Sequence, residues 1–428
     1  MSLKTTSIMH LTRFVIFAIL ILLIDWYFYQ AISTVLKTAS TGKKNLVFYI
    51  YAAITTISVL TVLTPIFYPY VEWNKFFRIY FFAAIAILLF SKIIGVIFLL
   101  IDDIIRLFRW IGSYLVKPET SDAIQASESS HKISRLKFLN YVALGMTAIP
   151  FAGFIYGMVR GAFNYTIHRT RVVLPNLPPE FNGFKIVQLS DIHSGSFTST
   201  KHVEEAVRIV LEQNADVIFF TGDLVNNEAT EMRPFMNVLN KLNAPHGVFS
   251  TLGNHDYGDY VQWETPQAKK QNLDDLKDVH KQLGWRLLMN EHVPLTKGDA
   301  SIALLGVENW GGNLSFPKYG DLKKAHTGTE KYPVKLLLSH DPSHWDKQVK
   351  PEYGDIDITF SGHTHGFQMG MEVPGFKWSP SKYIYKEWAG LYTDGNQHIY
   401  VNRGLGFLGY PGRVGISPEI TVMELYNA

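Results

Sequence analysis

The sequence predicts a chain of two parts, in which an all-α membrane domain of four helices precedes a layered α/β domain. Two observations carry this prediction. Long apolar stretches are confined to residues 1–165, whereas residues 166–428 alternate short apolar strands with amphipathic helices. The charge divides at the same place, because residues 1–165 carry a net charge of +8 and residues 166–428 carry −5, against +3 for the whole chain.

The composition excludes several classes of protein. Charged residues make up 18% of the chain and hydrophobic residues 47%, whereas a soluble domain is about one quarter charged. This apolar content excludes a disordered chain. Because the chain has no Cys, disulfide scaffolds, thiolate zinc sites and cysteine nucleophiles are excluded as well.

Four apolar stretches predict membrane-spanning helices, since a span needs about 20 apolar residues. They cover residues 14–36, 46–68, 79–101 and 141–159. The fourth is shorter and rich in Gly and Ala, so a buried core helix is its alternative interpretation. The apolar face of residues 103–115 predicts a helix lying in the membrane interface, and the polar segment 119–130 predicts a linker.

Basic residues in the short loops indicate the orientation of the spans. Six of them lie between the third and fourth stretches, namely Arg106, Arg109, Lys117, Lys132, Arg135 and Lys137. We therefore expect this segment to face the cytoplasm and both termini, with the α/β domain, to lie outside it. Residues 134–139 (SRLKFL) resemble a twin-arginine export signal whose second Arg is replaced by Leu. An ordinary basic helix flank is the alternative.

Two charged residues interrupt the spans and need a partner or a function. Asp25 lies within the first stretch and Lys92 within the third, at similar depths in two parallel helices. They are expected either to form an ion pair that holds the bundle together or to face a substrate.

The second part of the chain predicts a layered α/β domain with a substantial core. Strands are expected at residues 185–189, 217–221, 248–252, 302–307, 334–338, 356–360, 399–402 and 420–425. Helices are expected at 203–211, between the first two strands, and at 268–283, because apolar residues recur there at helical spacing.

Five of these strands are followed by Asp, His or Asn residues. Carboxyl ends of strands in an α/β sheet meet at one edge, where sites are built. The residues at this edge include Asp191, His193, Asp223, Asn254, His255, Asp256, His340, His363 and His365. One polar residue after a strand is usually a turn or a helix cap, but five strands that deliver such residues together indicate a site.

The residue types at this edge predict a metal centre. Oxygen and imidazole ligands without sulfur select Mn²⁺, Fe or Zn²⁺ over soft metals. A carboxylate can bridge two cations, which suits Asp223. Two metals about 3.5–4 Å apart bind both nonbridging oxygens of a phosphoryl group and generate a bridging hydroxide. The pattern therefore predicts hydrolysis of a phosphoester.

Five motifs in family order resemble the calcineurin-like metallophosphoesterases: Asp191-x-His193, Gly222-Asp223, Gly253-Asn254-His255-Asp256, His340 and Gly362-His363-x-His365. The resemblance implies an αββα sandwich with two divalent metal ions, Mn being favoured over Fe or Zn. It implies that Asp191, His193 and His365 bind one metal. It also implies that Asn254, His340 and His363 bind the other, and that Asp223 is shared. His255, followed by Asp256, would give a proton to the leaving oxygen or hold the phosphate.

The residues after these motifs resemble the bacterial membrane-associated branch of the family. The resemblance rests on Gln368 and on the segments 402–406 (NRGLG) and 411–413 (PGR). It implies a protein of the bacterial inner membrane that acts on a phosphodiester or a pyrophosphate-bearing lipid, and the loop charges place its catalytic domain on the periplasmic side. Phe367 departs from the pattern, because a second Gly is expected there. It either forms an apolar wall for a lipid-like substrate or packs within the loop.

Further residues are candidates for contacts with substrate or membrane. Arg403 and Arg413 could clamp a phosphate, with surface ion pairs as the alternative, and Trp310 could line the mouth of the site. Four aromatic residues form a candidate bilayer contact, with core packing as the alternative: Trp378, Tyr383, Tyr385 and Trp388.

The leading hypothesis is a membrane-anchored, metal-dependent hydrolase of a phosphate or pyrophosphate ester. Its expected partners are the lipid bilayer and a phosphorylated lipid or lipid-linked substrate. If the domain faces the cytoplasm, the resemblance favours a UDP-2,3-diacylglucosamine pyrophosphatase. A transport or receptor protein with a regulatory domain is the alternative of a different class. The net charge of −5 and the lack of a basic stripe argue against nucleic acid, and the sequence leaves the oligomeric state open.

Overall fold

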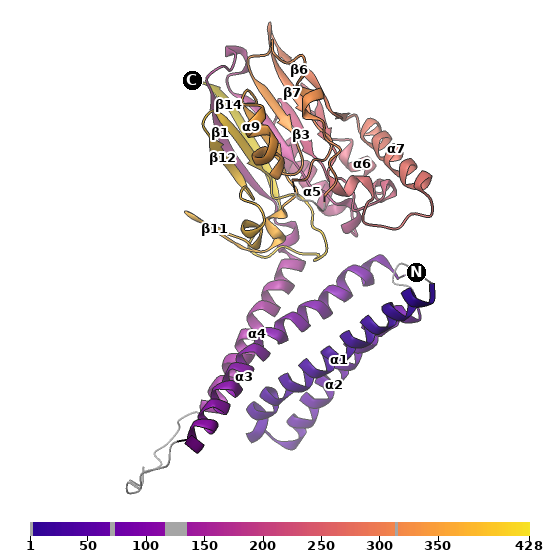
Figure 1. Cartoon of the computed structure of the whole chain (residues 1–428), viewed down its shortest axis with the longest axis vertical. Coiled ribbons are helices and arrows are strands. Elements are labelled where there is room, and N and C mark those ends of the chain that lie inside the picture. Colours follow the sequence, from indigo (N-terminus) through magenta and orange to yellow (C-terminus); the bar gives the residue numbers. More distant parts are fainter. Residues whose placement is uncertain (1–2, 69–72, 116–134, 313–315) are drawn as a thin grey trace. The chain divides into compact units, whose positions relative to one another are not determined.

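The computed structural model of this chain describes residues 3–68, 73–115, 135–312 and 316–428. They form two compact units, a membrane unit (Met1–Ile155) and a catalytic unit (Tyr156–Ala428). Figure 1 shows long helices in the first unit and packed sheets flanked by helices in the second.

The membrane unit contains the four predicted helices. They are α1 (Leu3–Val35), α2 (Thr41–Leu63), α3 (Phe82–Leu115) and α4 (Arg135–Val159). Four segments are long and apolar enough to cross a membrane: Thr12–Thr38, Thr41–Ile66, Phe77–Gly112 and Phe138–Phe163. Only 11% of the apolar window in the fourth segment is buried, so its interpretation as a core helix is wrong. The chain is a membrane protein.

The third helix is longer than predicted. Residues 103–115 continue α3 without a break, and its 34 residues extend over about 51 Å. The prediction of a separate interfacial helix is therefore wrong. Asp102 and Asp103 pair with Arg106 along the helix, and such pairs at i,i+3 and i,i+4 favour its continuation. The predicted linker at 119–130 and Ser134 of the export-like motif lie outside the described residues.

An ion pair joins α1 to α3 inside the membrane unit. Lys92 Nζ lies 2.7 Å from Asp25 Oδ1, and both side chains are almost fully buried. Thr55 of α2 donates to the second carboxylate oxygen, and the Tyr51 hydroxyl donates to the Asp25 carbonyl at 3.0 Å. The predicted ion pair is confirmed, and it ties three helices together.

Two six-stranded sheets form the centre of the catalytic unit. In the first sheet the order is β1 (Thr166–Leu174), β14 (Glu419–Asn427), β2 (Phe184–Leu189), β3 (Val217–Thr221), β4 (Val248–Thr251) and β5 (Arg286–Leu287). In the second it is β12 (Gly390–Asp394), β13 (Gln397–Val401), β9 (Ile358–Ser361), β8 (Lys335–Leu338), β7 (Ala300–Gly306) and β6 (Glu291–Lys297). β2, β3 and β4 run parallel, as do β7, β8 and β9, so their carboxyl ends share one edge.

Alternation along the strands divides the side chains among three apolar cores. Phe219 of β3 packs in the core between the sheets, whereas the next residue, Phe220, packs on the outer face of the first sheet. Helices α5 (Lys201–Leu211), α6 (Met236–Leu239) and α7 (Pro266–Gln282) cover that outer face. Helix α8 (Leu322–His326) and residues around α9 (Lys350–Glu352) cover the second sheet. The predicted αββα sandwich is confirmed.

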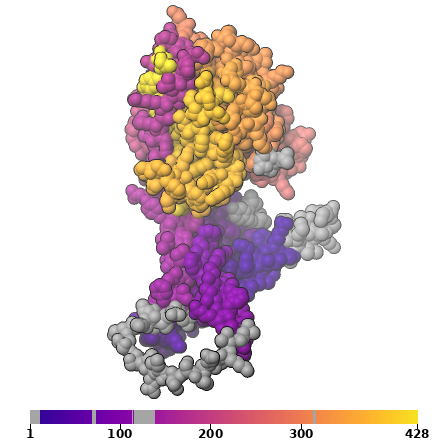
Figure 2. Space-filling model, turned by 60° about the vertical axis from the view of Figure 1, so that its left-hand side comes forward, coloured from indigo at the N-terminus to yellow at the C-terminus, as the bar shows by residue number. Residues whose placement is uncertain are grey.

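All eight predicted strands and both predicted helices are present, with bounds that differ by a few residues. The sequence reasoning missed β1, β5, β6, β12 and the hairpin of β10 (Met371–Val373) and β11 (Phe376–Trp378). β1 pairs in parallel with β14 along nine residues. Figure 2 shows the consequence, since yellow C-terminal residues lie among the magenta residues that begin the unit.

Candidate metal centre

The loops after β2, β3, β4, β8 and β9 bring the predicted ligands together at one edge of the two sheets. One group contains Asp191, His193 and His365, and a second contains Asp223, His340 and His363. Within each group the ligand atoms lie within 4.8 Å of one another. The first group has the same members as the first predicted ligand set, and the second contains the predicted shared ligand Asp223 with His340 and His363. Each group combines residues from both sheets.

A single carboxylate oxygen connects the two groups. Asp223 Oδ2 lies 3.5 Å from His193 Nε2 and 3.2 Å from His340 Nε2. The imidazole nitrogens also approach one another, with 3.0 Å between His193 Nε2 and His365 Nε2 and 3.2 Å between His340 Nε2 and His363 Nδ1. Converging nitrogen and oxygen atoms of this kind surround cations in proteins, so these residues fit two divalent metal ions that share Asp223.

The backbone at the ligands is strained. Asp191, His193, Asp223, His363 and His365 all have positive φ, between 50° and 71°. Residues with a side chain rarely adopt this region, at a cost of about 1–3 kcal/mol each. Such outliers persist only where the surrounding structure holds them. Their concentration here indicates that the loops are shaped to direct side chains toward one point.

Two glycines allow these loops to approach closely. A Cβ on Gly222 would lie 2.4 Å from the Gly253 nitrogen, and Gly222 has φ +93°. A Cβ on Gly362 would lie 1.9 Å from Ser190 Oγ. The backbone of His363 therefore reaches the Asp191 carboxylate, to which its N–H donates at 3.0 Å. This contact joins a ligand loop of one sheet to a ligand of the other.

Hydrogen bonds around the centre orient the imidazole rings. The Nδ1–H of His340 donates to the Thr221 carbonyl at 2.7 Å, which leaves Nε2 free to bind a metal. His363 Nε2 lies 2.7 Å from the Tyr385 hydroxyl, so a proton on Nε2 leaves Nδ1 free toward His340. Partners of this kind fix the tautomer of metal-binding histidines.

Asn254 presents a free amide oxygen. Its side chain is buried, and its Nδ2 donates to the Tyr260 hydroxyl at 2.8 Å. Its Oδ1 has no hydrogen-bond partner in the parts of the chain that the structure describes. A buried acceptor without a donor is costly, and coordination to a cation would satisfy it. His255, the residue after Asn254, donates its N–H to Asp223 Oδ1 at 2.8 Å, so Asn254 lies beside the shared ligand.

The electrostatics of the centre favour added positive charge. Burial raises the pKa of Asp191 to about 6 and lowers the pKa of His193 to about 3. Burial would also lower the pKa of His340, but the neighbouring carboxylate of Asp223 raises it to about 10. The acidic groups thus retain negative charge best when a cation is close, and neutral His193 is in the form that binds metals.

His255 and Asp256 have different roles, although they are neighbours. The His255 Nδ1–H donates to the Asn226 carbonyl at 2.8 Å, and its ring lies 4.9 Å from the ring of His193, so it borders the centre. Asp256 is fully buried, and its carboxylate accepts backbone N–H bonds from four residues: Asp223, Leu224, Val225 and Gly253. The expectation of a catalytic Asp256 is corrected, because it positions the loop of Asp223.

The expectation that Arg403 contacts a phosphate is also corrected. Its side chain is buried rather than on the surface, and its guanidinium forms ion pairs with Glu419 at 2.5 Å and with Glu372 at 2.6 Å. The guanidinium of Arg403 is therefore already paired with two carboxylates of the protein. The residues that follow in the same loop support the centre, because Gly406 N–H donates to the Asp191 carbonyl at 2.9 Å.

Arg413 is likewise used inside the protein. It is buried, and its guanidinium donates to the carbonyls of Arg403 at 2.8 Å, Gly404 at 3.0 Å and Gly406 at 2.5 Å. Its Nη2 also lies 3.3 Å from His365 Nδ1. The predicted phosphate clamp is thus replaced by a support for the loop next to His365.

Trp310 packs against a residue that is not one of the predicted ligands, unlike Phe316 of the same loop. Its ring stacks on His344, with centroids 4.6 Å apart, whereas Phe316 of the same loop lies edge-on against His363 at 5.0 Å. Phe316, Tyr260 and Tyr385 surround the centre, and sequence reasoning did not assign them to it. A lone aromatic residue in a loop carries no spacing signal, so the sequence offered no means of finding Phe316 or Tyr260.

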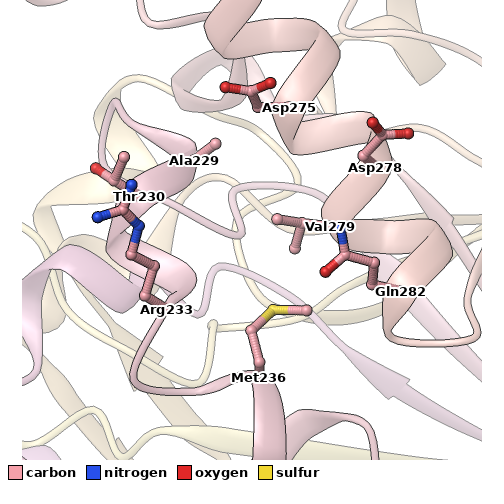
Figure 3. Close-up of a pocket in the computed structure, with 8 residues that line it drawn as sticks. All are labelled: Ala229, Thr230, Arg233, Met236, Asp275, Asp278, Val279 and Gln282. Carbon is pink, nitrogen blue, oxygen red and sulfur yellow. The ribbon is translucent and has the colours of Figure 1, made fainter.

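A surface cavity of about 230 Å³ lies between the turn Ala229–Met232 and helix α7 (Figure 3). Arg233 lies on one side of it, with Asp275 and Asp278 on the facing helix. None of the seven predicted metal ligands lines it. The cavity and the metal centre are separate features.

Comparisons with known proteins agree with this architecture. A family model described as "Probable Calcineurin-like phosphoesterase, transmembrane domain" matches residues 12–162, and one described as "Calcineurin-like phosphoesterase" matches residues 184–367. The uncharacterized metallophosphoesterase YkuE of Bacillus subtilis is 32% identical over 69% of this chain and 98% of its own length.

Two further relatives have more specific names. The phosphodiesterase YaeI of Escherichia coli is 28% identical over 68% of this chain and 99% of its own length. A transmembrane protein with metallophosphoesterase domain from Danio rerio is 29% identical over 64% of this chain and 60% of its own length.

Proposed function

This chain belongs to the calcineurin-like metallophosphoesterase family, and from that premise we propose that it hydrolyses a phosphate or pyrophosphate ester of a membrane lipid or lipid-linked intermediate. The single observation that carries the reaction class is the position of Asp223 Oδ2. This oxygen lies 3.5 Å from His193 Nε2 of the first ligand group and 3.2 Å from His340 Nε2 of its own group. A shared carboxylate between two sets of nitrogen and oxygen ligands is the arrangement that two-metal hydrolysis needs.

Seven side chains hold the metals in this proposal. Asp191, His193 and His365 would hold one ion, Asn254, His340 and His363 would hold the other, and Asp223 would serve both. When bound, two divalent cations supply Lewis-acid activation of the phosphoryl group and of the attacking water. Nitrogen and oxygen ligands without sulfur suit Mn²⁺, Fe or Zn²⁺, and we favour Mn²⁺.

In this proposal His255 donates a proton to the leaving oxygen. Its Nδ1–H is held by the Asn226 carbonyl, so Nε2 is the atom that can carry a proton to the substrate or contact its phosphate. General acid catalysis of this kind contributes about 10²–10⁴-fold to the rate. Asp256 keeps the loop in place through its backbone hydrogen bonds, and Phe316 and Tyr385 restrict access of water beside His363.

The membrane unit supports a lipid substrate. Four candidate spans anchor the chain, so the centre stays near a lipid surface and meets lipids at high local concentration. The basic segment between the third and fourth spans favours an orientation with the catalytic unit outside the cytoplasm of a bacterial cell. A reporter fused after Ala428 tests this orientation. The name of the relative YaeI, a phosphodiesterase, is compatible with an ester that carries two substituents.

The test is release of phosphate or head group by the detergent-purified full chain with Mn²⁺. The panel contains a lipid diphosphate, phospholipids and soluble nucleotides. We expect turnover of a lipid, and we expect Asp223→Asn to reduce it by more than about 100-fold, since loss of outer-shell partners alone costs 10–100-fold. His255→Gln is the matched variant, expected to lower turnover while metal binding persists.

The outcomes separate the components of the proposal. Turnover of soluble esters only would reject the lipid substrate and retain the reaction class. Equal turnover by Asp223→Asn and the unchanged protein would reject two-metal catalysis at this centre. Metal binding, followed by the Mn²⁺-dependent rise in thermal stability, provides a readout that does not depend on having the right substrate.

A further inference from the structure

The β10–β11 hairpin of the catalytic unit directs its polar side chains toward the protein and its apolar side chains outward. Antiparallel pairing places Val373 opposite Phe376 and Glu372 opposite Lys377. Glu372 forms its ion pair with Arg403, and Lys377 Nζ donates to the Ala389 carbonyl. Since residues of alternate pairs lie on opposite faces, the other face carries Met371, Val373 and Phe376.

This outward face belongs to a larger apolar patch, which we call the hairpin surface. Its members are between 50% and 73% exposed and comprise Phe367, Met371, Val373, Phe376, Tyr383 and Ile384. They are six of the twelve exposed large hydrophobic side chains that the structure describes in the catalytic unit. Exposed apolar residues scattered singly are normal, but gathered ones mark an interaction site. Figure 1 shows β11 extending away from the sheets.

Phe367, a member of the hairpin surface, has a strained backbone conformation. Its φ is +56°, a left-handed conformation that favours Gly and that costs a bulky side chain free energy. The ring is 52% exposed, so loop packing does not explain it. A strained backbone that presents an apolar ring to the outside fits a surface with an apolar partner.

Backbone hydrogen bonds link the hairpin surface to the end of the last membrane-spanning segment, Phe138–Phe163. Gly370 N–H, at the base of the hairpin, donates to the Val414 carbonyl at 2.9 Å, and Arg413 N–H donates to the Gly157 carbonyl of α4 at 3.1 Å. A Cβ on Gly161 would lie 2.1 Å from the Arg413 carbonyl. Arg413 and Val414 thus connect residues 157–161 to the base of the hairpin. All of these residues belong to the catalytic unit.

The geometry points to the bilayer interface as the partner of the hairpin surface. Gly157, near the end of the last candidate span, is hydrogen bonded to Arg413, and the next residue, Val414, is hydrogen bonded to the base of the hairpin. Aromatic and aliphatic side chains next to the exposed Lys382 match the composition of segments that lie in the interface, where a basic side chain attracts anionic lipids. The proposed partner is therefore the lipid surface and not a second copy of the chain.

Docking of this surface would bring the metal centre to the lipid head groups, a consequence that rests on the proposed function. The Ser379 hydroxyl donates to the Gly366 carbonyl at 2.7 Å, and the Thr364 hydroxyl donates to the Trp388 carbonyl at 2.7 Å. Tyr385, next to the surface residue Ile384, contacts His363. The segment that carries the hairpin surface therefore also holds the loop of His363 and His365.

The absence of Cys from the chain permits a direct test. Single Val373→Cys and Phe376→Cys variants of the full chain receive an environment-sensitive fluorophore in vesicles of phosphatidylethanolamine and phosphatidylglycerol that contain shallow nitroxide lipids. Asp299→Cys is the control, because Asp299 is exposed at the turn of the β6–β7 hairpin. We expect blue-shifted emission and lipid quenching at residues 373 and 376, and neither at 299.

Equal quenching at all three sites, or none at residues 373 and 376, would overturn the proposal. Quenching that depends on protein concentration instead of nitroxide lipid would assign the surface to a second copy of the chain and would also overturn it. A Val373→Asp/Phe376→Asp variant is expected to lower turnover of vesicle lipid relative to a soluble ester by tenfold or more. If quenching occurs as expected but the unchanged protein does not turn over lipid, the docking proposal stands and the proposed substrate is rejected.

Discussion

The two units of this chain both bury ionised side chains, but they differ in how those charges are satisfied. In the membrane unit Asp25 has a donor for each carboxylate oxygen, Lys92 for one and Thr55 for the other. In the metal centre of the catalytic unit, Asp223 Oδ2 faces imidazole nitrogens, and those nitrogens face one another at 3.0–3.2 Å. The first site contains matched donors and acceptors, and the second contains an excess of acceptors.

This difference separates a structural ion pair from a binding site. Burial alone does not, because the side chains of both sites are almost fully withdrawn from solvent. A buried acceptor needs a donor or a cation, so an excess of acceptors identifies a place suited to a cation. Arg403 and Glu419 are a second structural pair, within the catalytic unit, because Glu419 and Glu372 each accept from one terminal nitrogen of the Arg403 guanidinium.

The largest expected effect comes from breaking that second pair. Glu419 also accepts from the hydroxyls of Tyr400 and Thr421, each at 2.6 Å. A Glu419→Gln variant leaves the buried Arg403 without its closest carboxylate, and removing one partner of a buried pair costs about 3–5 kcal/mol. We expect a corresponding loss in the free energy of unfolding of the full chain at pH 7, measured by thermal or denaturant unfolding in detergent.

The effect should depend on pH in one direction. Burial opposes ionisation of Glu419, yet Arg403 lowers its pKa to about 2, below the usual value of about 4.3. A lowered carboxyl pKa stabilises the fold fully above the unfolded value, and that contribution declines as the pH falls toward 2. The difference between the two proteins should therefore shrink below about pH 4.3. Equal stability at pH 7 would show that this pair is not a structural one.

The second prediction concerns the ion pair in the membrane unit. We expect Asp25→Asn and Lys92→Met each to destabilise the unit, because each leaves a buried charge unpaired. The double variant should be less destabilised than the sum of the two, with a coupling energy of about 0.5–3 kcal/mol. Thermal unfolding of all four proteins in detergent measures it.

Activity sharpens this comparison. If the pair is structural, phosphoesterase turnover of the folded double variant should equal that of the unchanged protein. Additive effects with no coupling would remove the pairing, and turnover lost in a stable double variant would assign Asp25 and Lys92 to a substrate path instead.

The parts of the structure that the sequence predicted correctly are those that periodicity and strand ends determine. The four spans and eight of the strands follow from local patterns, and the same strand ends predict the ligand positions. β1 and β14 could not be paired from the sequence, because more than 240 residues separate the partners Thr166 and Glu419. Their contact depends on the whole sandwich.

The errors of interpretation have a common physical cause. Arg403 and Arg413 each stand next to a Gly and look exposed in the sequence, but their acceptors, Glu419 and the carbonyls of residues 403, 404 and 406, become neighbours only after folding. Asp256 stands inside a catalytic motif, yet four backbone N–H groups surround it. A sequence indicates which groups are polar, whereas their partners decide whether they are available.

The smallest expected effect tests a hydrogen-bond partner at the edge of the metal centre. Tyr385 contacts His363 Nε2 at 2.7 Å and so favours the tautomer whose Nδ1 can bind a metal. Loss of such a partner typically weakens metal binding by 10–100-fold. Tyr385→Phe keeps the ring and removes the hydroxyl, and we expect the low end of that range, about tenfold in Mn²⁺ affinity or about 1.4 kcal/mol.

Calorimetric titration of the detergent-purified chain with Mn²⁺ measures this change. Tyr383→Phe is the matched control, because the Tyr383 hydroxyl lies 3.3 Å from Trp378 Nε1 and the residue is exposed. At saturating Mn²⁺ the turnover of Tyr385→Phe should recover, since its defect lies in binding the ion. If the two variants bind Mn²⁺ equally well, the excess of acceptors at the centre is sufficient by itself, and the hydrogen bond from its edge has no part in selecting the tautomer.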